Sequence, residues 1–348
     1  MTKAADPKAP RAELERALRA RIDGKAKPVG ALGRLEELAI QIGLATGSLS
    51  PDLGLAKIIV FAGDHGLTAE GVTAYPSEVT REIAKLILAG TAGISVCARA
   101  ANAGVVLVDA GLLAPLDAHP RLIDRRIAAG TRNARLGPAM TTDERDAALR
   151  AGEDIVEAAV RDGTRVFAFG EVGIGNTSAS ALLAHALTGL GLYFLVGNGA
   201  GVPPLGLAHK REILAQTFAR AALPASPPGA RAEAALSEFC GFEMVMMAGA
   251  INAAARHACI VVVDGFIATA VAAAAIARDP RVRDHCIFAH ASADIGHWQL
   301  LENLGVEPLL LFGMRLGEGT GAALALPVVM AAAGILTGMA DLPGEHPQ

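Results

Sequence analysis

The stretch that decides the fold reads Leu309-Leu310-Leu311-Phe312-Gly313-Met314-Arg315-Leu316-Gly317-Glu318-Gly319-Thr320-Gly321. Its first four residues are an apolar run, which predicts a buried strand. The Ala-rich run that starts at Ala322 predicts a helix. Glu318 therefore lies among glycines at a strand-to-helix turn, where the backbone can bend tightly and approach a ligand closely. A carboxylate in that position is a candidate general base, although a solvated glutamate near a helix start is an equal alternative.

The same order of strand and then helix recurs throughout the upstream sequence. Predicted strands span 57–61, 105–108, 165–169, 193–196, 260–263, 286–289 and 309–312. Predicted helices include 11–22, 32–42, 91–103, 142–161, 208–222, 232–238, 243–257 and 266–278. This alternation predicts an α/β fold with a Rossmann-like, mostly parallel sheet covered by helices. Residues 1–10 are predicted to be disordered, and Ser77 is predicted to cap a helix that begins at Glu78.

Composition narrows the class of protein. The chain has 348 residues and a net charge of -4, with mixed charges and few aromatic residues, so no nucleic-acid surface is expected. Its four cysteines have neither disulfide nor zinc spacing, which indicates a reducing, cytoplasmic location. The uncharged run 319–340 contains Pro327 and lacks basic flanks, so we expect a buried helix and no membrane span.

Two motifs at predicted strand ends carry candidate chemistry. Asp64-His65-Gly66 follows the first strand and is either an acid/base element or a turn. No other metal-ligand spacing accompanies it, so no metal site is expected. The second motif, Gly173-Ile174-Gly175-Asn176-Thr177-Ser178, lies between a strand and a helix.

The second motif resembles a dinucleotide fingerprint but departs from it. Ser178 replaces the third glycine, and no acidic residue occurs between Glu171 and Glu212 to bind a ribose. A nicotinamide-dependent oxidoreductase is therefore disfavoured. The turn can still bind one phosphate through backbone N–H groups, the helix dipole and the hydroxyls of Thr177 and Ser178, or it can be a simple helix cap.

Isolated polar residues could complete such a site. Lys210 could supply a positive charge to a phosphate, or lie on a solvated helix face. Asp264 and the pair Ser292 and Asp294 follow predicted strands, where sugar hydroxyls are often bound and where helix caps use the same residues.

Taken together, four motifs resemble the nicotinate-nucleotide–dimethylbenzimidazole phosphoribosyltransferase family of the cobalamin lower-ligand pathway. In chain order they are Lys27-Pro28-Val29-Gly30-Ala31-Leu32-Gly33-Arg34-Leu35-Glu36, Asp64-His65-Gly66, Gly170-Glu171-Val172-Gly173-Ile174-Gly175-Asn176-Thr177 and Met314-Arg315-Leu316-Gly317-Glu318-Gly319. They are spread over nearly the whole chain, and the last of them is the most specific.

The resemblance implies a homodimer whose substrates are nicotinate mononucleotide and a benzimidazole-type base, with no cofactor. It implies a small helical domain built from residues 1–50 and 326–348 around a catalytic domain of residues 51–325. Glu318 matches the catalytic base and Glu171 a second acidic residue of the site. The phosphoribosyl group is expected to contact Gly173, Gly175, Asn176, Thr177, Ser178, Lys210, Asp264 and Ser292. The base is expected to contact Asp64, His65, Tyr75, Pro76, Leu316 and Gly317.

Two departures leave the acceptor base open. Some members of the family carry Ser where Tyr75 stands and Gln where Ile83 stands. The acceptor is therefore dimethylbenzimidazole, another benzimidazole, a purine or a phenolic compound. A non-enzymatic nucleotide or base sensor is the remaining alternative, although the retained Glu318 argues against it.

Overall fold

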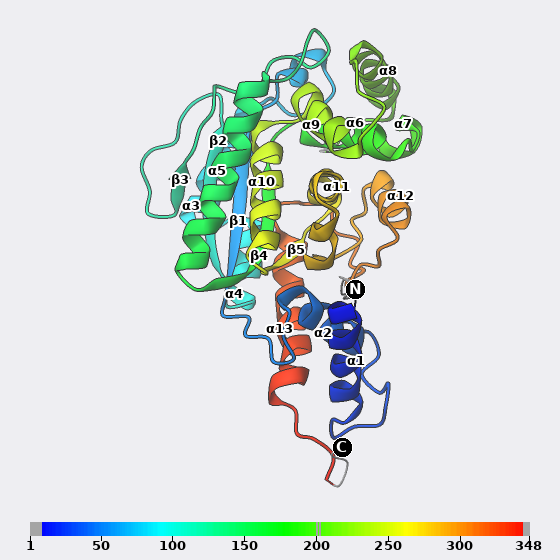
Figure 1. Cartoon of the computed structure of the whole chain (residues 1–348). Coiled ribbons are helices and arrows are strands. Elements are labelled where there is room, and N and C mark those ends of the chain that lie inside the picture. The colour runs from blue at the N-terminus through cyan, green and yellow to red at the C-terminus, as the bar shows by residue number, and fades with distance from the viewer. Residues whose placement is uncertain (1–8, 200, 202, 344–348) are drawn as a thin grey trace, which may run out of the picture.

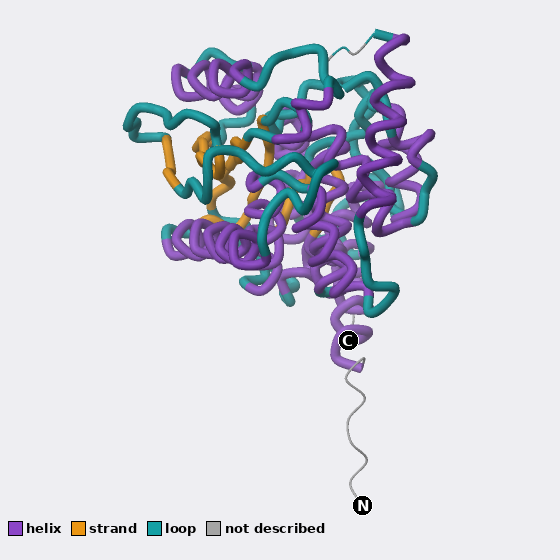
Figure 2. The backbone as a smooth tube through the Cα atoms, turned by 90° about the horizontal axis from the view of Figure 1, so that it is seen from above, coloured by secondary structure: helices purple, strands orange, loops and turns teal. Residues whose placement is uncertain are grey.

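The computed structural model describes residues 9–199, 201 and 203–343. Its sheet has six parallel strands in the order β3-β2-β1-β4-β5-β6, as a doubly wound nucleotide-binding fold has. The strands are β1 (Leu55–Gly63), β2 (Gly104–Gly111), β3 (Leu122–Asp124), β4 (Thr164–Val172), β5 (Ile260–Val263) and β6 (Cys286–Phe288). The predicted α/β fold with a parallel sheet is confirmed; the central strands lie between helices, and the edge strand β3 lies among loops (Figure 2).

Alternation along the strands creates two hydrophobic cores, one on each face of the sheet. Ile59 and Phe61 of β1 belong to one core, and Ile58 and Val60 belong to the other. The first core is covered by α5 (Thr142–Arg161), α6 (Asn176–Thr188), α9 (Pro228–Phe239), α10 (Phe242–Arg256), α11 (Phe266–Arg278) and α12 (Ile295–Leu304). The second is covered by α1 (Ala9–Asp23), α2 (Arg34–Thr46), α3 (Glu78–Ala89), α4 (Gly93–Ala100) and α13 (Thr320–Gly338). The short helices are η1 (Gly66–Glu70), α7 (Leu192–Leu195) and η2 (Pro280–His285), and α8 (Pro204–Arg220) lies beside α7.

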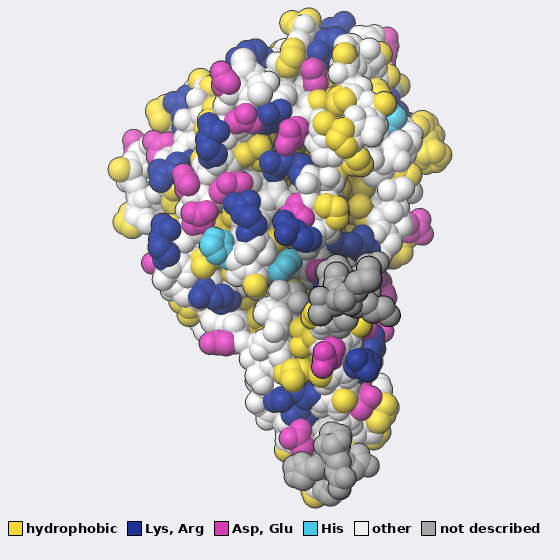
Figure 3. All heavy atoms as spheres, viewed as in Figure 1, with side chains coloured by type: hydrophobic (Ala, Val, Ile, Leu, Met, Phe, Trp, Pro, Cys, Tyr) yellow, Lys and Arg dark blue, Asp and Glu magenta, His cyan; other side chains and the backbone are white. Residues whose placement is uncertain are grey.

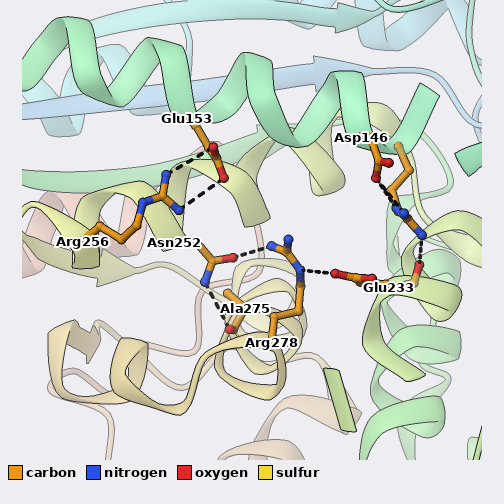
Figure 4. A network of polar contacts seen from close by, with 8 residues as sticks. Asp146, Glu153, Glu233, Asn252, Arg256, Ala275 and Arg278 are labelled. Carbon is orange, nitrogen blue, oxygen red and sulfur yellow. Dashed lines mark hydrogen bonds and ion pairs between the residues drawn. The ribbon is translucent and has the colours of Figure 1, made fainter. Parts of the chain in front are cut away.

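Polar contacts tie the helices of the first core together at their edges. Arg256 of α10 pairs with Glu153 of α5 at 3.2 Å, and Arg278 at the end of α11 pairs with Glu233 of α9 at 3.4 Å. Arg278 also donates to the side-chain oxygen of Asn252 on α10 (Figure 4). These pairs are partly exposed, so we attribute their effect mainly to alignment of the helices.

Helices α5 and α10 pack with their backbones almost in contact because glycines face the partner helix. A Cβ built on Gly249 would lie closer than 3.0 Å to three backbone atoms of Leu149. We expect Gly249→Ala to lower the free energy of unfolding by about 1–3 kcal/mol through overpacking. Gly334 in α13 has open space around it, so Gly334→Ala should raise stability by up to about 1 kcal/mol. Urea denaturation measures both changes, and equal stability of the two variants would contradict this packing.

The two ends of the described chain form a narrow helical extension below the sheet (Figure 1). Helices α1 and α2 pack there beside the C-terminal part of α13. The buried Lys25 donates to Asp341 at 2.8 Å, and Ala26 N donates to Ala340 O. Helix α13 is continuous across residue 325, and the division into a small helical domain and a catalytic domain stays a prediction.

Two predicted strands are wrong. Residues 193–196 contain helix α7 in place of a strand. Residues 309–312 are irregular, with one bridge between Leu310 and His290, and Leu311 and Phe312 are 68% and 65% exposed. The apolar run therefore ends at the surface. Ser77 precedes α3, but its hydroxyl pairs with Thr68 Oγ1 and does not cap the helix.

The predicted N-terminal disorder can be compared with the structure only at the last residues of the predicted segment. The predicted disorder of residues 1–10 lies largely outside the described residues, and α1 already begins at Ala9. On the face shown in Figure 3, basic and acidic side chains are interspersed, and hydrophobic side chains gather where Figure 1 shows α7. Tyr193 and Phe194 of that helix are 66% and 54% exposed.

By length and composition alone, two helical stretches of the described chain could cross a membrane: Glu78–Ala100 and Thr320–Gly338. The second corresponds to α13, which packs against α2, α4, β4 and β5 and contains Pro327. Its contacts are those of a helix that covers a sheet, and 56% of its most apolar window is buried.

Candidate active site

A cavity of about 260 Å³ lies at the carboxyl ends of the strands. This edge, next to the β1–β4 switch point, is where open α/β sheets bind ligands. Of the residues predicted from sequence, the cavity is lined by Glu171, Gly173, Asn176, Thr177, Asp264, Ser292, Leu316, Gly317 and Glu318. The predicted residues that do not line it are Asp64, His65, Tyr75, Pro76, Gly175, Ser178 and Lys210.

Glu318 is held in the cavity wall by an unusual backbone. Gly317, Glu318 and Gly319 all have left-handed φ angles, of 81°, 61° and 85°. A non-glycine residue in this region costs about 1–3 kcal/mol, so the surrounding structure must impose it. Glu318 N donates to Glu171 O at 3.2 Å, and the loop lies directly on the backbone of Gly170 in β4.

The Glu318 side chain reaches the start of another helix. Its Oε2 accepts a hydrogen bond from Ile94 N, in the first turn of α4, at 3.0 Å. The residue is only 6% exposed. Burial raises the pKa of Glu318 above its usual value, and the nearby Asp264 carboxylate raises it further, while the Ile94 amide lowers it. The net rise makes this carboxylate a better proton acceptor when ionised.

Two more buried carboxylates share the cavity. Asp264 follows β5 and caps α13, because its oxygens accept from Ala322 N at 2.8 Å and Gly319 N at 3.2 Å. Glu171 in β4 accepts a hydrogen bond from the Asn176 side chain. Burial raises the pKa of Asp264, and burial followed by the charge of Asp264 raises the pKa of Glu171 well above its usual value. The three carboxyl groups therefore resist ionising together, and a cationic ring bound among them would favour their ionised forms.

The opposite part of the site is suited to an anion. Gly173 begins the turn after β4, and Asn176 and Thr177 open α6, whose N-terminus points its dipole at this region. Lys210 of α8 lies just behind the lining, 2% exposed, and donates to Thr177 Oγ1 at 3.4 Å and Gly197 O at 3.3 Å. Burial lowers the pKa of Lys210 to about 8, although the Asp294 carboxylate opposes this effect.

Ser178 illustrates why adjacency in sequence does not ensure a shared role. Its side chain is fully buried on the inner side of α6, with an unpartnered hydroxyl, and only the neighbouring Thr177 lines the cavity. Successive helical residues point in different directions, so both hydroxyls cannot face the same ligand. Ser292 does line the cavity, and its hydroxyl donates to Asp294 at 3.0 Å.

The Asp64-His65-Gly66 motif lies behind the cavity wall. Asp64 Oδ2 accepts from Leu113 N at 2.8 Å, and His65 pairs with Glu243 of α10 at 2.6 Å. Both motif side chains are buried. Tyr75, in contrast, is 52% exposed in the loop before α3.

Several lining residues were not assigned from sequence. His290 follows β6, is 3% exposed, and has its Nε2 3.8 Å from Asp264 Oδ1. Phe266 and Ile267 of α11 add apolar surface beside Ile83 of α3, which the resemblance had already placed near the base. Only the strand-end position of His290 could have indicated a site, since apolar helix residues carry no such signal. Among residues 9–199, 201 and 203–343, no group of three or more His, Cys, Asp or Glu side chains is arranged to hold a metal ion.

Comparisons with known proteins agree with this geometry. A family model described as phosphoribosyltransferase matches residues 8–343. Nicotinate-nucleotide–dimethylbenzimidazole phosphoribosyltransferase from Cupriavidus necator is 48% identical over 327 residues, covering 94% of this chain and 93% of that protein. The enzyme of the same name from Aromatoleum aromaticum is 43% identical, covering 94% of both chains.

Solved structures give the same relationship. The crystal structure of CobT from Thermus thermophilus is 42% identical and superposes with a TM-score of 0.89, covering 94% of this chain and 97% of that one. With a family match over nearly the whole chain and relatives this similar, the protein belongs to the nicotinate-nucleotide–dimethylbenzimidazole phosphoribosyltransferase family.

Proposed function

We propose that this enzyme transfers the phosphoribosyl group of nicotinate mononucleotide to 5,6-dimethylbenzimidazole, giving α-ribazole 5′-phosphate and nicotinate, with Glu318 as general base. One observation carries the proposal: a buried carboxylate with a raised pKa shares one cavity with a helix N-terminus suited to phosphate.

The chemistry needs few charged groups. The bond between ribose C1′ and the cationic ring nitrogen breaks, and its electron pair neutralises that nitrogen, so no general acid is required. One benzimidazole nitrogen attacks C1′ from the opposite face and inverts it. The proton on the other nitrogen passes to Glu318. In their ionised forms, the carboxylates of Glu171 and Asp264 would stabilise the cationic ring and the positive charge that develops at C1′.

The cavity suggests which predicted contacts are direct. We assign the phosphoribosyl group to Gly173, Asn176, Thr177, Asp264 and Ser292, with Lys210 behind Thr177. We assign the base to the side of Leu316 and Gly317, facing Ile83. Gly175, Ser178, Asp64 and His65 would then support the cavity from behind. Tyr75 and Pro76 would border the base from the loop before α3.

The identity of the acceptor is tested by a panel of bases. Each of dimethylbenzimidazole, benzimidazole, adenine and a phenol is mixed with nicotinate mononucleotide, and nicotinate release and product mass are measured. We expect the highest kcat/KM with dimethylbenzimidazole, because Ile83 and Leu316 offer an apolar surface for its methyl groups. Binding of nucleotide without nicotinate release for any base would identify a sensor.

Lys210 should act mainly on nucleotide binding. We expect Lys210→Ala to raise the dissociation constant of nicotinate mononucleotide about 10- to 100-fold, the usual range for loss of a charged hydrogen bond. Since the pKa of Lys210 is about 8, its cation is lost as pH rises, and wild-type affinity should fall above that pH. Calorimetry from about pH 6.5 to about pH 9 measures both effects, because this range brackets the titration of the amine, with the exposed Lys85→Ala as control. Unchanged affinity of the Lys210 variant would rule out the phosphate role.

We also propose a homodimer in the cytoplasm. The exposed apolar side chains of Tyr193, Phe194, Leu311 and Phe312 offer surface that a second copy could cover. All four cysteines are free, which suits a reducing compartment. Light scattering should give twice the chain mass of 35.5 kDa, and a monomer mass at micromolar concentration would refute the dimer.

A further inference from the structure

A buried ion pair stands directly behind the cavity wall. His65, which follows β1, approaches Glu243 of α10 with Nε2 and Oε1 2.6 Å apart. Their side chains are 3% and 0% exposed. Removing two charges from water is costly, and apolar residues could fill such a space at no loss of stability. The pair therefore calls for an explanation other than packing.

Glycines surround this pair and give it room. A Cβ on Gly63 or Gly241 would lie closer than 3.0 Å to Glu243 Oε2. A Cβ on Gly173 would lie 3.4 Å from both Glu243 Oε1 and His65 Nε2, and 2.6 Å from Gly63 O. The two charged groups thus meet in a space that is left by glycines at the ends of β1 and β4 and at the start of α10.

On one side, the pair contacts the turn that we assign to the nucleotide. Gly173 lies next to both of its members, since a Cβ there would be 3.4 Å from each, and a Cβ on Gly175 would lie 3.3 Å from His65 Cβ. Ile174, between these glycines, lines the cavity. Any movement of the imidazole ring would therefore be transmitted to the backbone of this turn.

On the other side, His65 is linked to helix α3, which carries the cavity residue Ile83. Thr68 Oγ1 donates to His65 O at 2.8 Å and is 3.0 Å from Ser77 Oγ, next to the start of α3. Within α3, Thr80 Oγ1 accepts from Ile174 N at 3.0 Å. The contacts therefore form a closed loop from His65 through α3 to the turn and back.

The neighbouring carboxylates favour the protonated form of His65. Burial by itself would lower the pKa of His65, but the Glu243 carboxylate and the hydrogen bond to it outweigh burial, and Asp64 adds to them. The pKa of His65 is raised overall, so the Glu243 carboxylate favours the protonated ring.

We propose that His65 and Glu243 are a positioning pair that fixes the 173–175 turn relative to α3, and so sets the distance between the phosphoribosyl donor and the acceptor base. Neither residue touches the reacting atoms. The inference rests on the proposed assignment of the turn to the nucleotide. Since a misplacement of about 1 Å can cost roughly 100-fold in rate, such a pair would act on kcat.

The main test compares Glu243→Gln with Glu243→Ala and with His65→Gln/Glu243→Gln. A glutamine oxygen can still accept from His65, so we expect Glu243→Gln to keep kcat within about threefold of wild type. We expect Glu243→Ala and the double variant to lose about 10- to 100-fold in kcat at saturating nucleotide and base. Circular dichroism confirms that each variant is folded at the assay temperature.

His185→Gln is the matched control. His185 is half-buried, and its Nδ1 is 2.7 Å from Leu190 O at the far end of α6. We expect this variant to lose stability with no loss of kcat. Folded Glu243→Ala and double variants with wild-type kcat and KM would overturn the positioning role.

A second variant tests the link without disturbing the pair, in case Glu243→Ala does not fold. Thr68→Val keeps the side-chain shape but removes the hydroxyl contacts to His65 O and Ser77. We expect kcat to fall about three- to tenfold, as for loss of one or two hydrogen bonds. Wild-type kinetics of this variant would refute the connection to α3. Absence of turnover by the wild-type chain would instead refute the proposed function itself.

Discussion

Glu318→Gln should lower turnover by about 100- to 10,000-fold, the usual contribution of a general base. Glutamine is chosen because its side-chain oxygen can still accept the hydrogen bond from Ile94 N that Glu318 Oε2 accepts. The start of α4 is therefore preserved, and only the basicity is removed. Nucleotide affinity should stay within about threefold of wild type, because the proposed role of Glu318 is to accept a proton from the base and not to bind the nucleotide. Product formation and calorimetry measure the two quantities separately.

The pH dependence gives an independent check on Glu318. Its pKa is raised, so its acid form persists to higher pH than that of an ordinary glutamate. Since only the ionised form accepts a proton, wild-type kcat/KM should rise as pH increases through this pKa, and the Gln variant should lack that rise. The exposed Glu307→Gln serves as control and should match wild type. Turnover of the Glu318 variant within about tenfold of wild type, less than a general base contributes, would exclude it as the base.

The sheet was predictable because its signal is local and strong. The run 260–263, Ile-Val-Val-Val, is predicted to be a strand with the bounds that β5 has. A central parallel strand is buried on both faces, so every position must be apolar. The same criterion failed at 309–312, where the apolar residues extend beyond the sheet and two of them are exposed. An apolar run indicates residues that are either buried in the fold or covered by a partner. The sequence does not distinguish these two cases.

The site was predictable where one strand end supplies a residue by itself. Asp264 follows β5 directly and Gly173 follows β4, so topology alone brings both to the cavity. His65 follows β1 in the same way but turns away from the cavity toward Glu243. That partner lies 178 residues away on α10, and nothing in the local sequence indicates it.

The structure also adds a second role for two residues that were predicted from sequence to lie in the site. Asp264 was expected to bind the ribose, yet both of its oxygens accept backbone hydrogen bonds from the start of α13. Glu318 likewise accepts from the start of α4. The cap interpretation and the functional one are thus compatible, because a carboxylate that caps a helix is held rigidly at the cavity wall.

Gly170→Ala should disable the enzyme without altering any residue that lines the cavity. A Cβ on Gly170 would lie closer than 3.0 Å to the carbonyl carbon and oxygen of Glu318 and to Gly319 N. All three are backbone atoms of the loop that holds Glu318 in its left-handed conformation, so no side-chain rotation can relieve the clash. A shift of this loop by about 1 Å would cost roughly 100-fold in kcat, and overpacking would cost about 1–3 kcal/mol of stability.

Gly104 provides the matched comparison for this substitution, because it also lies in a strand but a Cβ added there would have no atom within 4 Å. Gly104→Ala should therefore retain wild-type kcat and stability. Thermal unfolding and steady-state kinetics of the two variants separate general strand effects from displacement of the Glu318 loop. If Gly170→Ala kept wild-type kcat, the proposed base would not depend on the close backbone contact between β4 and this loop, and the hydrogen bonds of Glu318 to Ile94 and of Gly319 to Asp264 would have to set its position.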